Sequence, residues 1–169
     1  MMWIPTTLWS EHWATLRSQR DNSPMKADRR AFVGIPVLVG IATTIWPPDN
    51  VGVILDGTAI TTALLFGLLI HVFSLGIAAS NDDRLRGTWV LDLIDQLRIN
   101  TAYAIMIGIL AVIFLSVAGA YSSAPSWFEV PISSIGIALV VHLLMTLGMV
   151  IKRTNRAYTE MRSRSRQLH

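Results

Sequence analysis

Two histidines lie inside apolar runs of the sequence, where an ionisable side chain is most able to do chemistry. His71 stands in LLIHVFS and His142 in VVHLLMT, and neither stretch contains Asp, Glu, Lys or Arg. A neutral imidazole offers one hydrogen-bond donor and one acceptor, titrates near neutral pH, and ligates haem or metals. The two stretches are therefore compatible with hydrogen bonds between helices, with a polar ring or gate in an oligomeric pore, or with a pair of axial haem ligands.

Other chemistry has little raw material in this chain. The apolar runs hold no Asp, Glu, Lys or Arg, so a carboxylate proton relay or a paired-carboxylate hydrolase site has no candidate there. No glycine-rich phosphate loop or His-x-x-x-His metal pair stands out, and the absence of cysteine removes thiol catalysis and thiolate metal sites. We expect a protein that is not an enzyme, with no cofactor and no metal site; haem ligation by His71 and His142 is kept as an alternative.

The elements that must position these histidines are four uncharged runs, in a chain of 169 residues of which 52% are apolar and 15% charged. The runs are residues 31–46, 59–79, 101–120 and 132–151. About 20 helical residues cross the roughly 30 Å hydrocarbon layer of a bilayer, and three of the four runs reach that length. The sequence therefore predicts an all-α integral membrane protein with four transmembrane helices in two hairpins.

The basic residues predict how these spans face. All fourteen lysines and arginines lie before the first span, between the second and third, or after the fourth. Because lysine and arginine near the ends of membrane spans are retained on the cytoplasmic side, both termini are expected in the cytoplasm. The expected location is the cell inner membrane, which the chain crosses four times. This rule accounts for the basic charge, so we expect no nucleic acid as a partner.

The depth of the two histidines follows from the same spans. Counted from the outer ends, His71 and His142 are both expected near the midplane, each facing the bundle interior, a water-filled cavity or another subunit. Asp56 comes just before the second span and is interpreted as its helix cap, or alternatively as a carboxylate at a pore mouth. His71, His142 and Asp56 are thus the candidates for a pore or gate.

Three segments outside the spans are candidates for contact with anionic lipid or with a protein. Residues 1–30 contain a predicted amphipathic helix with tryptophans that suit a membrane interface. Residues 82–100 predict an amphipathic cytoplasmic helix between spans two and three, and residues 152–169 form a basic cytoplasmic tail. The candidate contact residues are Trp9, Trp13, Leu85, Trp89, Leu93, Leu97, Lys152, Arg153 and Arg156.

The function expected from this layout depends on assembly, because four short helices enclose no wide pathway by themselves. The leading hypothesis is a small oligomeric bacterial inner-membrane effector or sensor, which permeabilises the membrane or is gated in response to a cytoplasmic partner. Small helical membrane proteins of bacterial antiviral systems share this general layout, although no motif identifies such a family. The alternatives are a non-conducting anchor or accessory subunit of a larger complex, and a haem-binding redox subunit.

Overall fold

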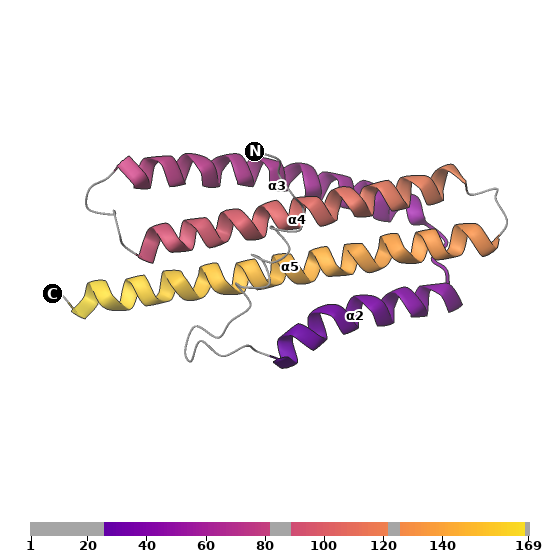
Figure 1. Cartoon of the computed structure of the whole chain (residues 1–169), viewed down its shortest axis with the longest axis horizontal. Helices are drawn as coiled ribbons and strands as arrows, with labels where there is room; N and C mark the ends of the chain where they lie inside the picture. The colour runs from indigo at the N-terminus through magenta and orange to yellow at the C-terminus, as the bar shows by residue number, and fades with distance from the viewer. Residues whose placement is uncertain (1–25, 82–88, 122–125, 168–169) are drawn as a thin grey trace.

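The computed structural model describes residues 26–81, 89–121 and 126–167, and the side chains of residues 26–29, 89, 126, 153, 154 and 156–167 are outside that description. Four helices make up almost all of it (Figure 1): α2 (Lys26–Ile45), α3 (Val51–Asn81), α4 (Trp89–Ala120) and α5 (Ser126–Gln167). The predicted all-α class is confirmed. The predicted N-terminal amphipathic helix, with Trp9 and Trp13, lies outside the described residues, as does Leu85.

Three of these helices contain stretches long and apolar enough to cross a membrane: Val51–Asn81, Val90–Ala120 and Trp127–Lys152. A helix satisfies its backbone hydrogen bonds internally, which is why uncharged apolar runs of this length form helices in a bilayer. The apolar part of α2, Arg30–Ile45, is shorter. Three helices are therefore compatible with a multi-pass membrane protein, and the four crossings, with α2 as one of them, stay a prediction.

The helices are longer than the predicted spans. α3 begins at Val51, so Asp56 lies in the second turn of the helix and is not its cap. The predicted cytoplasmic helix at 82–100 and the third span form one continuous helix from Trp89, and α5 continues through the basic tail to Gln167. The sequences after Asn50, after Trp89 and after Lys152 contain no proline that would end these helices, so the backbone continues through the change in polarity.

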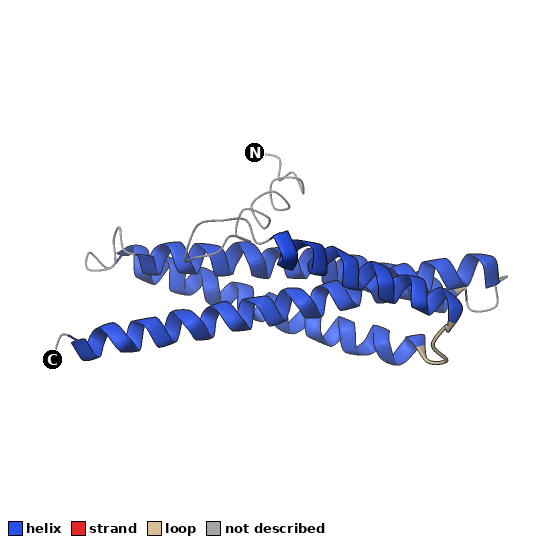
Figure 2. Cartoon of the chain, turned by 90° about the horizontal axis from the view of Figure 1, so that it is seen from below, coloured by secondary structure: helices blue, strands red, loops and turns tan. Residues whose placement is uncertain are grey.

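The helices form an open layer in the order α3, α4, α5, α2. α4 packs between α3 and α5, while α2 packs on the far side of α5 and, among the described helices, contacts α5 alone. The long axes run in roughly one direction (Figures 1 and 2), and α2 lies beside one half of α5. Of the two predicted hairpins, the helices of the second pack together, but α2 and α3 do not.

A glycine at each interface lets neighbouring helices approach closely. A Cβ on Gly40 of α2 would lie 3.2 Å from Cβ of Ala138 on α5, and one on Gly136 of α5 would lie 2.7 Å from the Leu115 side chain of α4. A Cβ on Gly108 of α4 would collide with Thr62 of α3. Small residues are the usual means of helix packing in membranes, where lipid is as apolar as the helices themselves.

One apolar cluster joins the three long helices. It consists of Leu65, Tyr103, Ala104, Ile105, Ile107 and Leu143, with Tyr103 and Ala104 fully buried. Large apolar side chains on the outer faces of α2 and α3 remain exposed, among them Leu38 at 66% and Leu64 at 71%. In a bilayer such faces meet acyl chains or other helices, so their exposure is expected for a membrane protein.

The two ends of the layer differ in composition. At one end α2 begins, α3 ends, α4 begins and α5 runs on past Lys152; we call this the base-rich end. The opposite end carries the exposed rings of Trp46, Tyr121 and Trp127, and its loop residues include no lysine or arginine.

Candidate functional site

His142 is buried at the junction of three helices, with 7% of its surface exposed. Its Nε2 lies 2.8 Å from the hydroxyl of Tyr103 on α4, and its Nδ1 lies 3.2 Å from the carbonyl oxygen of Phe32 on α2. Because a carbonyl only accepts, Nδ1 carries a proton. In the neutral ring Nε2 then accepts from the Tyr103 hydroxyl, so both nitrogens are in use.

Pro36 explains why the Phe32 carbonyl is open to His142. In an α-helix the carbonyl of residue 32 accepts from the backbone N–H of residue 36. Proline has no N–H, and Pro36 lies inside α2. The imidazole of α5 thus supplies the donor that α2 lacks, and a buried backbone acceptor is satisfied by a side chain from another helix.

Aromatic contacts fix the orientation of the His142 ring. The Phe32 ring meets it edge-on with centroids 4.9 Å apart and an interplanar angle of 78°, and the Tyr103 ring meets it at 5.9 Å and 73°. The prediction that this histidine bonds a hydroxyl or carbonyl of a neighbouring helix is confirmed. The signal that sequence reasoning missed is the proline four residues after Phe32, which removes the N–H that this carbonyl would accept in a regular helix.

His71 has a different environment, because it is exposed on α3. α3 and α5 touch little, and α4 lies between them, so the structure does not bring His71 and His142 together. With both His142 nitrogens hydrogen-bonded, the two imidazoles do not face one haem in this arrangement.

The two histidines also lie at different levels. The guanidinium carbon of Arg98 lies 6.0 Å from the centroid of the Phe73 ring, so His71, two residues before Phe73, is within a turn of the level of Arg98. His142 bonds Tyr103, further from the base-rich end of α4. The two levels differ by roughly one to two helical turns, about 5–10 Å, so the equal depth obtained by counting residues does not hold.

His71 belongs to an exposed stripe that runs the length of α3. Its members alternate at four and three residues, the spacing of a helix-packing seam, and every one is exposed. They are Val53, Gly57, Ile60, Leu64, Gly67, His71, Ser74 and Ala78; we call them the His71 stripe. A Cβ added at Gly57 or Gly67 would meet nothing within 4 Å. Small residues therefore flank the imidazole on a surface open to another helix.

The neighbouring exposed side of α3 has a different composition. It carries the large side chains of Phe66, Ile70, Phe73 and Ile77, which are 46%, 68%, 47% and 63% exposed. Such residues suit contact with acyl chains, whereas glycine, serine and alanine suit contact with a helix. The two sides of α3 are thus suited to different surroundings.

Hydroxyl groups in the helices bond mainly to their own backbone. Thr62 donates to the Thr58 carbonyl at 2.8 Å, Ser74 to the Ile70 carbonyl at 3.1 Å, and Thr146 to the His142 carbonyl at 2.9 Å. The hydroxyl protons of these three residues are thus donated within their own helix, so they need no acceptor on another helix.

The remaining candidate residues are spread over the molecule. Asp56 is exposed on α3, far along the helix from His71; Leu93 and Leu97 are half-buried on α4; and Lys152 is exposed on α5. Trp89, Arg153 and Arg156 lie within helices, and their side chains are outside the description. Within the described residues, no group of three His, Asp or Glu side chains is placed to hold a metal ion.

Comparisons with known proteins found no relative of this chain. The sequence matches no family model, and neither the curated proteins nor the solved structures contain a match to it.

Proposed function

We propose that this chain assembles with copies of itself in a bacterial inner membrane and permeabilises that membrane when a cytoplasmic partner engages it. All four helices cross the bilayer, with the base-rich end in the cytoplasm. The assembly contact is the His71 stripe of α3.

The membrane placement is supported by the levels of the innermost bases. Arg30 and Lys152 stand at the base-rich ends of the apolar segments of α2 and α5, and Arg98 lies just before the uncharged run 101–120 of α4. α2 has 20 residues, close to the roughly 30 Å hydrocarbon thickness. α3, α4 and α5 have 31, 32 and 42 residues and are therefore about 46, 48 and 63 Å long. Their excess length extends past α2 at the base-rich end (Figure 1).

The His71 stripe carries the proposal. An imidazole enclosed between two packed α3 helices needs a donor and an acceptor, and a second imidazole supplies both. Gly67, Ser74 and Ala78 allow another α3 to approach within van der Waals contact of that position. Because α3 is an edge of the layer and packs mainly on α4, the stripe is available for a neighbouring copy. A ring of such copies would enclose a pathway that one chain does not.

The proposed coupling to a cytoplasmic partner is supported by the parts beyond the bilayer. α5 continues for 15 residues after Lys152, and α4 begins nine residues before Arg98. These helical extensions offer a rigid surface to a soluble protein. The same observation favours the second candidate, a non-conducting anchor that holds a cytosolic protein at the membrane.

The assembly is tested by the mass of the detergent-solubilised complex. Gly67→Ile adds bulk where the chain itself has open space, so the helix should fold normally but another α3 should no longer fit. We expect the parent to be oligomeric and Gly67→Ile to be monomeric. Gly148→Ile is the matched control, because Gly148 is also open but lies on α5; it should keep the parent mass.

The activity is tested with the same pair of variants. Expression of the parent and of Gly148→Ile should collapse the membrane potential, measured with a potential-sensitive dye, and Gly67→Ile should leave it intact. Collapse by a monomeric Gly67→Ile protein would contradict the proposed assembly. An intact potential in the parent, together with a stoichiometric co-purifying soluble protein, would favour the anchor instead. Protection of cells against phage in the parent but not in Gly67→Ile would support a role in antiviral defence.

A further inference from the structure

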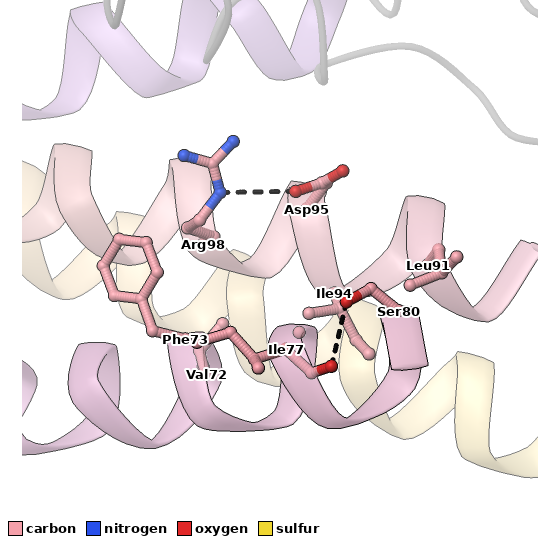
Figure 3. Close-up of a pocket in the computed structure, with 9 residues that line it drawn as sticks. Val72, Phe73, Ile77, Ser80, Leu91, Ile94, Asp95 and Arg98 are labelled. Carbon is pink, nitrogen blue, oxygen red and sulfur yellow. Dashed lines mark hydrogen bonds and ion pairs between the residues drawn. The ribbon is translucent and has the colours of Figure 1, made fainter. Parts of the chain in front are cut away.

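A cavity of about 390 Å³ lies between α3 and α4 at the base-rich end. Its walls are mainly apolar, with Phe73 and Ile77 from α3 and Ile94 from α4, while Asp95 and Arg98 of α4 stand at its rim. Figure 3 shows these side chains together. The combination of apolar walls with one positive and one negative group is suited to an amphiphile.

The two charged groups form an exposed ion pair. Arg98 Nε lies 3.3 Å from an Asp95 carboxylate oxygen, and the two side chains are 39% and 67% exposed. The guanidinium also lies 6.0 Å from the centroid of the Phe73 ring. The dashed line in Figure 3 joins Asp95 to Nε, so this ion pair does not use the terminal nitrogens of the guanidinium. A pair this exposed is only weakly bound to itself, so both charges can take a second partner.

The order of the two charges along the membrane normal is informative. Asp95 precedes Arg98 by three residues on a helix that enters the bilayer after Arg98, so the carboxylate lies about 4.5 Å nearer the cytoplasm. In a phospholipid with an amine headgroup, the phosphate is deeper and the ammonium is nearer to water. In such a headgroup the phosphate is therefore at the level of Arg98, and the ammonium is at the level of Asp95.

A path for an acyl chain continues from the rim into the membrane. Phe73, Ile70 and Phe66 recur at three- and four-residue spacing on one side of α3, so they lie in a row from the cavity towards the bilayer interior. Each is exposed, at 47%, 68% and 46%. This row is separate from the His71 stripe, which lies on the other exposed side of the helix.

We propose that this cavity is a binding site for a phosphatidylethanolamine. Arg98 binds the phosphate, Asp95 accepts hydrogen bonds from the ammonium, and one acyl chain lies along Phe73, Ile70 and Phe66. The inference rests on the membrane placement of α3 and α4 and not on assembly through the His71 stripe. Asp95 gives the site its selectivity, because a phosphatidylglycerol brings the phosphate but meets the carboxylate without an ammonium.

The selectivity is tested by native mass spectrometry of the full chain, taken from bilayers with equal amounts of phosphatidylethanolamine and phosphatidylglycerol. We expect phosphatidylethanolamine to be retained about tenfold over phosphatidylglycerol, which corresponds to about 1.4 kcal/mol. Asp95→Asn should abolish that preference or reverse it. Arg98→Gln should lower retention of both lipids. Equal retention by the parent, or a preference unchanged in Asp95→Asn, would overturn the proposal.

A second variant tests the cavity itself. A Cβ on Gly76, which lines the cavity, would lie 3.5 Å from Cγ2 of Ile94, an ordinary contact, so we expect the longer side chain of Gly76→Leu to occupy the cavity. Gly148→Leu, at an open position on α5, is the matched control. Gly76→Leu should lose the retained lipid while the control keeps it. Because retention is read for each oligomeric state separately, a monomer that selects phosphatidylethanolamine would support this site even if assembly through α3 failed.

Discussion

At the scale of single residues, the best-defined feature of the molecule is the pairing of Pro36 with His142. Each would be unfavourable alone: the proline leaves the Phe32 carbonyl without its helical N–H, and the histidine brings two polar nitrogens into an apolar core. Together they satisfy one another, and the Tyr103 hydroxyl satisfies the remaining nitrogen.

Removal of the imidazole should destabilise the fold. His142→Ala leaves the Phe32 carbonyl and the Tyr103 hydroxyl without this partner in a buried site, and we expect a loss of about 1–3 kcal/mol in the free energy of unfolding. The measurement is denaturation of the detergent-solubilised protein followed by tryptophan fluorescence. Leu144→Ala, at an exposed neighbour on the same helix, should change the free energy far less. Equal losses in the two variants would contradict a specific role for the ring.

The pairing itself is tested by a double-mutant cycle. Pro36→Ala restores a backbone N–H that bonds the Phe32 carbonyl, so His142→Ala should be less damaging in that background, by about 1 kcal/mol. Additive losses in the double variant would show that the proline and the histidine act independently.

At the scale of elements, the sequence was sufficient for the three long apolar helices and less so for their ends. Uncharged runs of about 20 residues predicted the spans because exclusion from water dominates there. Where the runs ended, polarity changed but the backbone had no reason to stop, so α3 took in Asp56 and α4 took in the segment from Trp89. A periodic pattern locates an apolar face, whereas a helix end depends on prolines and caps.

The choice of neighbours could not be predicted, because it depends on which glycines meet which side chains. Gly136 and Gly148 are both on α5, yet a Cβ on Gly136 would lie 2.7 Å from the Leu115 side chain and one on Gly148 would meet nothing within 4 Å. The same holds for the candidate site. Both histidines were identifiable from the sequence, but only the packing shows that one is buried with partners and the other is exposed.

The difference between these glycines gives a test of the α4–α5 interface. Gly136→Ala forces the Leu115 side chain to move, and overpacking of this kind typically destabilises by about 1–3 kcal/mol. Gly148→Ala should be neutral or slightly stabilising, because alanine favours a helix. The measurement is the thermal midpoint of the solubilised protein, which should fall for the first variant alone. A fall of the same size in both variants, or no fall in Gly136→Ala, would contradict a specific contact between Gly136 and Leu115 at this interface.

At the scale of the whole molecule, an open layer leaves two edges, α2 and α3, in contact with the surroundings. The chain lacks cysteine, so a single introduced thiol reports the location of any position. Asp49→Cys, in the exposed loop after α2, should react with a membrane-impermeant maleimide in intact spheroplasts. Asn155→Cys, exposed on α5, should react only after permeabilisation. The reverse pattern would invert the topology and remove the lipid site from the inner leaflet.

The contact of α2 with α5 joins two segments that are synthesised at different times. Phe32 and His142 are 110 residues apart, and a ribosome that adds about 5–20 residues per second needs about 5–20 s to make that stretch. For that interval α2 has been synthesised, while the part of α5 that carries His142 has not. α2 is thus the earliest of the described helices to be made and the last to find its neighbour, and a factor that shields nascent membrane segments would act on it first.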